Sequence, residues 1–257
     1  MPQSLRVVLW ASLVFSIAAS LMAGASLLMS IGVLKPAVSI AQRNADEIRQ
    51  FILDNPTVVL ESVQRHEEES QAIAEDEAEV ALRQSKQELL RSASPVSGNP
   101  QGDVTLVEFF DYNCPYCRKA GPILDQATSA DSGLRIVYKE WPILGPGSEF
   151  AARAALAAQK QGKYIEFHRA LMSSGIKVDE ASTLQIAATV GLDLEELKTD
   201  MESDAVKAEL DRNYSLAEKL RITGTPVFVV GNEIVRGFVE LPTLQQAIAN
   251  SRKKTGD

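Results

Sequence analysis

Both cysteines of this chain lie in one short stretch, Asp111–Cys117, which reads DYNCPYC. Two residues separate Cys114 from Cys117, and the 257-residue sequence contains no further cysteine. A disulfide across two residues closes almost no loop, so it would add little to the stability of the fold. The spacing therefore favours redox chemistry of the pair over a structural role.

The residues around the pair predict how it reacts. TLVEFF at 105–110 is typical of a buried strand, and RKAGPILDQATSA, just after the pair, has helical spacing. The first turn of a helix favours a thiolate through its unpaired N–H groups and its dipole. We therefore predict that Cys114 is the exposed nucleophile and Cys117 the resolving thiol. A stabilised thiolate would also make the disulfide a better oxidant.

Three nearby residues are candidates to support this chemistry. Pro115 sets a helical φ without removing a needed donor, and Tyr116 adds no charge, so its effect should be modest. Glu108 stands in the middle of the predicted strand. A carboxyl buried there would have a raised pKa and could exchange protons with Cys117. Alternatively, Glu108 pairs with Lys139 on a neighbouring strand, since a buried charge needs a partner.

Zinc binding is the competing interpretation of two cysteines, but a zinc site usually has four ligands. The two histidines, His66 and His168, are far from the pair in sequence. We expect His168 to be a packed or surface residue of a helix and His66 to be exposed. The prediction is no metal ion, and no cofactor beyond the redox-active Cys114–Cys117 disulfide.

The N-terminal region predicts export. Val7–Leu34 is an uncharged run that would span about 42 Å as a helix, against about 30 Å for a hydrocarbon core. This length favours an uncleaved transmembrane anchor within residues 1–35, while Ala23-Gly24-Ala25 leaves a cleaved signal peptide open. The net charge of −8 offers no basic surface, so we predict no nucleic-acid binding.

Residues 41–92 are predicted to form a helical stalk. Apolar residues around Phe51 form a stripe, Asp54-Asn55-Pro56 breaks the helix, and a second helix runs from about Thr57 to Leu90. Its coiled-coil heptads are degraded, with polar residues at many core positions. The stalk is therefore either solvated or a homo-oligomerisation segment within residues 44–92.

The composition of Ser92–Gly102, SASPVSGNPQG, predicts a linker and a domain boundary. Beyond it, Leu134–Lys139 is a second predicted strand, and the sequence from Ser148 to about Leu220 is predicted to be helical. Two further strands, Val227–Val230 and Glu233–Arg236, are predicted to form a hairpin with a two-residue turn.

Taken together, VEFFDYNCPYC, YKEWPILGPGSEFAARAALAAQKQGKYIEFHRALM and TGTPVFVVGNEIVRG resemble the DsbA family of thioredoxin-fold thiol–disulfide oxidoreductases. The resemblance implies an α/β thioredoxin fold over residues 98–252, with a helical domain inserted at about 148–220. It implies that Pro226 follows a cis bond and faces the cysteines, and that Thr225 contacts the substrate chain. Glu108 matches the acidic residue beneath the active site in this family.

Two features depart from the best-known DsbA enzymes. The central dipeptide is Pro115-Tyr116 instead of Pro-His, which would make the disulfide less oxidising. Asn44–Glu61 resembles the N-terminal segment of ScsC-like and Com1-like relatives, where it can mediate oligomerisation. An oligomer with several active sites would suit a disulfide isomerase.

The resemblance implies an oxidoreductase of the bacterial periplasm, anchored to the inner membrane or released by cleavage. It would form disulfide bonds in cysteine-containing exported proteins and be reoxidised by a membrane redox partner of the DsbB type. One alternative is an oligomeric isomerase or reductase that another membrane partner keeps reduced. An alternative of a different class is a chaperone-like binding module that does not need its cysteines.

Overall fold

The computed structural model describes residues 16, 22–23, 37–91 and 93–255. The chain divides into two compact units, Met1–Gln71 and Ala72–Asp257. Within the described ranges, no helix is both long and apolar enough to cross a bilayer. The predicted anchor, Val7–Leu34, falls outside those ranges except at residues 16, 22 and 23.

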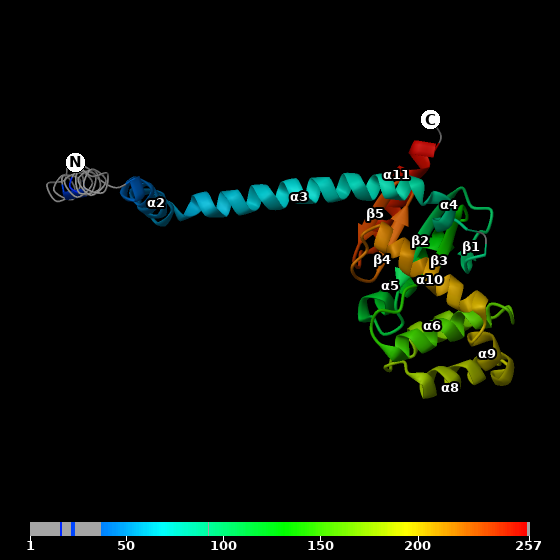
Figure 1. The fold of residues 1–257 in the computed structure, drawn as a ribbon. Coiled ribbons are helices and arrows are strands. Elements are labelled where there is room, and N and C mark those ends of the chain that lie inside the picture. Colours follow the sequence, from blue (N-terminus) through cyan, green and yellow to red (C-terminus); the bar gives the residue numbers. More distant parts are fainter. Residues whose placement is uncertain (1–15, 17–21, 24–36, 92, 256–257) are drawn as a thin grey trace, which may run out of the picture. The chain divides into compact units, whose positions relative to one another are not determined.

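From residue 37 onward, the first unit consists of two helices (Figure 1). They are α2 (Ala37–Asp54) and the beginning of α3 (Pro56–Gln84). Asn55 separates them, and both its backbone N–H and its Nδ2 donate to the Phe51 carbonyl at 2.9 Å. The predicted helix break at this point is confirmed.

One mixed sheet of five strands forms the centre of the second unit, in the spatial order β1-β3-β2-β4-β5. Strand β2 is parallel to β3 and antiparallel to β4, and β1 and β5 add antiparallel edges. The predicted strands and the hairpin are confirmed. The bounds are β1 (Val96–Gly98), β2 (Val104–Phe110), β3 (Leu134–Glu140), β4 (Val227–Val230) and β5 (Glu233–Arg236).

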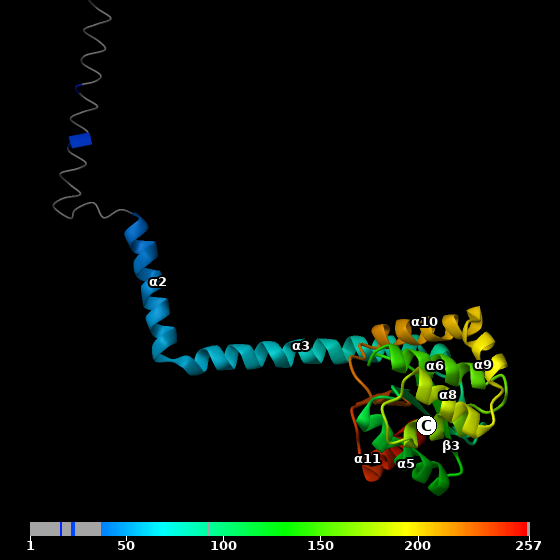
Figure 2. The ribbon, with the colours of Figure 1, turned by 90° about the horizontal axis from the view of Figure 1, so that it is seen from below.

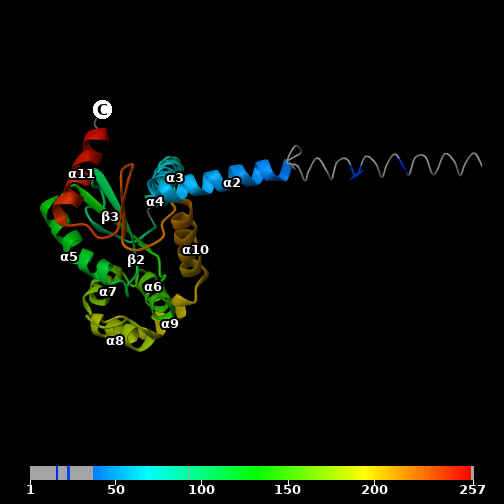
Figure 3. The same cartoon turned by 90° about the vertical axis from the view of Figure 1, so that its left-hand side faces the viewer.

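Helices cover both faces of this sheet. On one face, α5 (Pro115–Ala130) and α11 (Leu241–Thr255) pack side by side (Figures 2 and 3). Alternate residues of β2, such as Leu106 and Phe110, point to that face, while Val107 and Phe109 point to the other. The second face is covered by α10 (Asp204–Lys219), by α4 (Lys86–Leu89) and by the end of α3. The sheet is therefore buried between two layers of helices.

Five helices follow β3 and form the segment predicted as an insertion. Helix α6 lies at the centre of this group and is buried along most of its length, since its many alanines allow neighbouring helices to approach closely. The bounds are α6 (Pro146–Ala158), α7 (Tyr164–Ser173), α8 (Glu180–Val190), α9 (Leu194–Met201) and α10 (Asp204–Lys219).

The boundary of the second unit differs from the predicted one. The compact unit begins at Ala72, and Leu82 and Leu89 are buried in its core. The predicted linker, Ser92–Gly102, contains the edge strand β1. The cause is tertiary, because antiparallel pairing with β3 orders a segment whose Ser, Pro and Gly content is typical of a linker.

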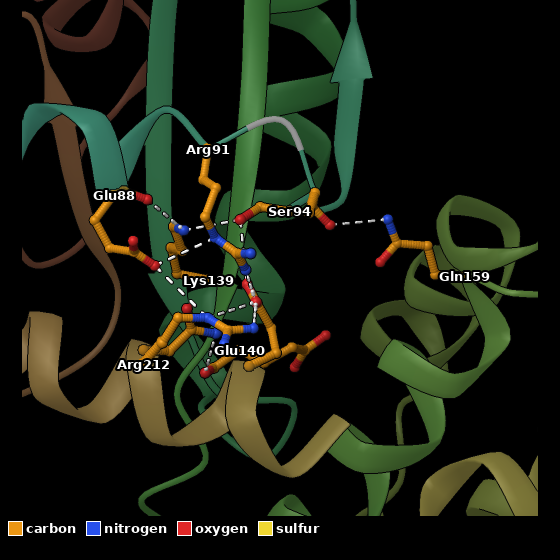
Figure 4. A network of polar contacts seen from close by, with 10 residues as sticks. Glu88, Arg91, Ser94, Lys139, Glu140, Gln159 and Arg212 are labelled. Carbon is orange, nitrogen blue, oxygen red and sulfur yellow. Dashed lines mark hydrogen bonds and ion pairs between the residues drawn. The ribbon is translucent and has the colours of Figure 1, made fainter. Parts of the chain in front are cut away.

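A polar network attaches the segment before β1 to the sheet and to α10 (Figure 4). The buried Lys139 ammonium donates to the Glu88 carbonyl at 3.0 Å and to Ser94 Oγ at 2.8 Å. Ser94 Oγ in turn donates to Glu209 at 3.2 Å, and Glu209 forms an ion pair with Arg91. These contacts explain why the chain before β1 belongs to the second unit.

Candidate functional site

The cysteine pair lies at the junction predicted from the sequence. Strand β2 ends at Phe110, a short turn follows, and Cys114 is the N-cap of α5 with Pro115 in its first turn. The Cys114 N–H donates to the Asp111 carbonyl at 3.1 Å, and the Cys114 carbonyl accepts from Arg118 N–H at 3.1 Å. Cys114 therefore begins the hydrogen-bonded helix and lies where unpaired N–H groups are available.

Several donors stabilise the Cys114 thiolate. A hydrogen bond from the Cys117 side chain has the largest effect on the Cys114 pKa, and the Thr225 side chain and the Cys117 and Tyr116 N–H groups add to it. Against the opposing effect of burial, they lower this pKa to about 5. The residue is only 5% exposed, so the expectation of an exposed Cys114 is wrong. The lowered pKa nevertheless favours the thiolate, which is the nucleophilic form of cysteine.

Cys117 has the opposite environment. It lies one turn into α5 and is fully buried. Burial raises its pKa strongly, and the hydrogen bond to Cys114 and the charge of Glu108 raise it further. At neutral pH the reduced pair therefore holds one thiolate, on Cys114, and one thiol, on Cys117.

Glu108 lies on the face of β2 that carries α5. It is 1% exposed, and burial, followed by the nearby Cys114 charge, raises its pKa to about 8. Its Oε1 has no hydrogen-bond partner within the described chain. The alternative ion pair with Lys139 is wrong. Residue 138 is opposite Glu108 in the sheet, so Lys139 points to the other face, where it contacts Ser94.

The loop before β4 lies against the nucleophile. The Thr225–Pro226 peptide bond is cis, as the resemblance implied. In the thiol form, Cys114 Sγ donates to the Thr225 carbonyl at 3.4 Å. Tyr116 is 54% exposed, and its ring lies 6.4 Å from that of Phe238. The structure thus brings Thr225, next to Pro226, to Cys114, and leaves Tyr116 on the surface beside the pair.

A buried polar cluster that was not predicted lies behind the site. Glu140 Oε1 accepts from Tyr112 OH and from Tyr164 OH, each at 2.7 Å. His168 Nδ1 lies 3.1 Å from Tyr112 OH, and burial lowers the His168 pKa to about 3. His168 is therefore packed and neutral, one of the two predicted possibilities. The one sequence feature that could have indicated this cluster is the acidic residue Glu140 directly after the predicted buried strand.

No group of three or more His, Cys, Asp or Glu side chains suited to a metal ion occurs among the described residues. His168 is occupied in the buried cluster, where it stacks on Tyr164 with ring centroids 5.7 Å apart. The arrangement around the cysteines supports thiol–disulfide exchange through the side chains themselves.

The reaction of Cys114 with a small disulfide should depend weakly on pH in the neutral range. Because the pKa is about 5, the rate should rise with pH up to about 6 and then level off, and each unit below 5 should cost about tenfold. Stopped-flow reaction with oxidised glutathione, together with thiolate absorbance at 240 nm, measures this profile. In Cys117→Ser the pH midpoint of this rate profile should shift, because the hydrogen bond from the Cys117 side chain, which has the largest effect on the Cys114 pKa, is replaced by one from serine. A wild-type midpoint near pH 8 would contradict the assignment.

The DSBA-like thioredoxin domain family model matches residues 105–249. A thioredoxin-like oxidoreductase from Silicibacter pomeroyi DSS-3 is 54% identical, with a TM-score of 0.64, and the match covers 65% of this chain and 97% of that one. The thiol-disulfide exchange protein alpha-DsbA2 from Wolbachia pipientis is 25% identical, with a TM-score of 0.64, over 68% and 96% of the two chains.

One further solved structure matches over most of both chains, whereas a curated relative matches over only a small part of its own length. Proteus mirabilis ScsC in a transitional conformation is 27% identical, with a TM-score of 0.63, over 86% of this chain and 99% of that one. This similarity extends beyond the region of the family model. Among curated proteins, the Na(+)/H(+) antiporter NhaA 3 of Salinispora tropica is 27% identical over 158 residues, which is 61% of this chain. The match spans only 24% of that antiporter's length.

Proposed function

This chain belongs to the family of DSBA-like thioredoxin domains, and we propose that it forms disulfide bonds in exported proteins that contain cysteines. Its membership in the family and its similarity to thiol-disulfide exchange proteins make it a thiol–disulfide oxidoreductase. The observation that carries the proposal is the contrast within the pair. The Cys114 pKa is lowered to about 5, whereas burial raises that of Cys117.

In the proposed cycle, a substrate thiolate attacks Cys114 Sγ of the disulfide, and Cys117 leaves as the thiolate and is protonated. The second substrate thiolate then attacks the substrate sulfur of the mixed disulfide and displaces Cys114. The substrate gains one disulfide, and the enzyme keeps both electrons as two cysteines in the reduced state. A low Cys114 pKa favours this direction, because it makes Cys114 a good leaving group.

The surrounding residues have distinct parts in this proposal. Thr225 and Pro226 would hold the substrate chain by backbone contacts, since the Thr225 carbonyl already faces Cys114 Sγ. Glu108 would give and take the Cys117 proton, because its pKa of about 8 is close to ambient pH. Pro115 sets the start of α5, and Tyr116 offers an exposed ring beside the pair.

We place the protein in the bacterial periplasm, held at the inner membrane by its N-terminal run or released from it by cleavage. The reduced pair would then need a membrane protein that returns it to the disulfide, a role that a quinone-linked partner of the DsbB type would fill. This proposal rests on the sequence of residues 7–34 and on the family.

The strongest alternative is an oligomeric isomerase or reductase kept reduced by another membrane partner. Large apolar side chains of the first unit, among them Phe51, Leu53 and Leu60, are more than half exposed. Such residues are usual at interfaces between chains. Because the similarity to ScsC covers 86% of this chain, it includes part of this segment.

The resting redox state of the pair in the native cell separates these proposals. Acid quenching followed by alkylation with a bulky reagent reports the free thiols of Cys114 and Cys117 as a gel shift. The oxidase should be found mainly oxidised, because its partner keeps returning it to the disulfide. A mainly reduced pair would rule out the oxidase and favour the isomerase or reductase.

A further inference from the structure

The active-site loop, which joins α10 to β4 and contains the cis bond, is tied at both ends to the end of β5. Arg236 Nη1 donates to the Arg221 carbonyl at 3.0 Å, and Arg236 Nη2 donates to the Leu220 carbonyl at 3.3 Å. The next residue, Gly237, donates its N–H to the Pro226 carbonyl at 2.9 Å. Two successive residues therefore hold this loop at its beginning and at its end.

The active-site loop begins with a backbone conformation that side chains rarely adopt. Arg221 has a φ of 51°, and no other residue except glycine has a positive φ in the part of the chain that the structure describes. Its N–H donates to the Glu218 carbonyl at 3.0 Å, and the Ile222 N–H donates to the Ala217 carbonyl at 2.8 Å, which closes the end of α10. A residue with a side chain keeps such a conformation only where its surroundings fix it. The two bonds from Arg236 contribute to this fixation.

The guanidinium of Arg236 suits the position that it occupies. The last carbonyl groups of a helix lack partners within the helix and carry negative partial charge. Leu220 is the C-cap of α10, so two N–H groups of one planar cation meet two successive carbonyls there. Arg236 lies opposite Val227 in the pairing of β5 with β4, so the sheet fixes its backbone. The loop is thus anchored to the most ordered element nearby.

Four residues lie between the two anchored ends and lead to the nucleophile. The first, Ile222, is buried in the apolar core, whereas Thr223 and Gly224 are exposed. Thr225 completes the loop, and its carbonyl accepts from Cys114 Sγ at 3.4 Å. The direction of the chain at the first anchor sets how Ile222 enters the core, and with it the path of the exposed backbone toward Cys114.

We propose that Arg236 is a positioning residue for thiol–disulfide exchange: by fixing the two carbonyls at the start of the active-site loop, it holds the exposed backbone where a substrate chain can bind beside Cys114. In this role Arg236 touches neither the substrate nor a sulfur atom, and it acts only through the loop. The inference rests on the proposed part of Thr225 and Pro226 in holding the substrate. It applies equally to oxidation and to reduction of a substrate, so it can fail while the oxidase function stands.

Arg236→Met is the sharpest test, because it keeps a long unbranched side chain and removes every N–H donor from it. The half-saturating concentration of a peptide substrate should rise at least about fivefold, while the limiting rate should stay within about threefold of the wild type. Arg236→Lys keeps the charge and can still donate to the carbonyls, although in a different geometry. It should therefore raise the half-saturating concentration less and in the same direction.

A second readout follows the nucleophile itself. Thr225 is among the groups that lower the Cys114 pKa, so a displaced loop should stabilise the thiolate less. In Arg236→Met the Cys114 pKa should therefore be higher than in the wild type. Thiolate absorbance of the reduced full-length protein at 240 nm, recorded against pH, measures this shift without any substrate.

The substrate experiment mixes oxidised full-length protein with a varied excess of a fluorescent peptide dithiol and follows one turnover by stopped flow. The first peptide thiolate attacks Cys114 Sγ, and Cys117 leaves and takes up a proton. The second peptide thiolate then closes the peptide disulfide and displaces Cys114, so both electrons pass to the protein and no further oxidant is needed. The rate constants give the half-saturating concentration and the limiting rate, and the amplitude gives the folded fraction. A purely structural loss would lower the amplitude alone.

The direction of the reaction is tested separately from the part of Arg236. A wild-type protein that reduces the peptide disulfide and does not oxidise the dithiol would contradict the oxidase function. The same comparison of half-saturating concentrations would then use the reduced protein and the peptide disulfide, and the expected effect of Arg236→Met is unchanged.

Arg153→Met is the matched control, because Arg153 also donates to a carbonyl at the end of a helix. Its Nε and Nη2 both donate to the carbonyl of Met201, the last residue of α9, at 3.3 Å. The control should lower thermal stability and leave the half-saturating concentration at the wild-type value. The proposal is overturned if Arg236→Met leaves both the half-saturating concentration and the Cys114 pKa unchanged. It is equally overturned if Arg153→Met raises the half-saturating concentration by the same factor.

Discussion

Replacing Cys114 with serine is expected to reduce thiol–disulfide exchange by at least about 1000-fold, to the uncatalysed rate. A serine hydroxyl is not ionised at neutral pH and cannot form a disulfide, so the stabilising donors around position 114 have no thiolate to act on. Oxidation of a fluorescent peptide dithiol by the full-length protein measures the loss. Full function of Cys114→Ser in the cell would instead support the chaperone-like alternative.

Cys117→Ser is the matched variant for this experiment. It keeps the nucleophile and removes the thiol that resolves or leaves, so mixed disulfides with substrates should persist. The sequence holds only two cysteines, so every adduct of this variant must be at Cys114. Mass spectrometry of the adducts from cells would identify the substrates directly. Adducts that disappear as fast as in the wild type would contradict the assignment of Cys117.

The second large effect is expected from Glu108→Gln, as a change in how stability depends on pH. Burial raises the Glu108 pKa from 4.5 to about 8, so between these values the folded protein holds a proton that the unfolded chain has released. The unfolded state then binds fewer protons, and stability falls as pH rises. The raised Glu108 pKa therefore lowers the free energy of unfolding by about 1 kcal/mol at pH 5 and by about 3 kcal/mol at pH 7.

Glutamine cannot ionise, so the variant should lose this pH-dependent cost. The free energy of unfolding of the variant minus that of the wild type should therefore be about 2 kcal/mol larger at pH 7 than at pH 5. Urea unfolding of the reduced proteins at the two pH values provides the comparison. The exposed Glu166 supplies the control, because Glu166→Gln should leave the pH dependence as it is. Parallel pH profiles for Glu108→Gln and the wild type would mean that Glu108 is not protonated in the folded state.

Much of the site was predictable because it depends on local sequence. A buried strand that leads into a helix places Cys114 at the helix start and Cys117 one turn further, whatever packs around them. The same holds for the hairpin of β4 and β5, which has a two-residue turn with Gly231 at a positive φ of 61°. The family resemblance added what lies far away in sequence, the cis bond before Pro226.

The tertiary structure decided which buried charges meet. Sequence alone allowed Glu108 to pair with Lys139. The strand register places the two on opposite faces of the sheet, so Glu108 does not pair with Lys139, and Lys139 binds Ser94. The segment before β1 also joins the second unit through long-range contacts, although its composition is that of a linker.

The sequence by itself predicted the chemistry of this protein, because two cysteines two residues apart at a helix start favour one thiolate and one partner thiol. Only the tertiary structure decided how that turn is held. Apart from the Asn113 N–H, the donors that fix Asp111 and Asn113 come from residues 143–178, which contact the turn only after the inserted helices have packed. Spacing along the chain carries no information about such contacts, since they depend on how distant elements fold together.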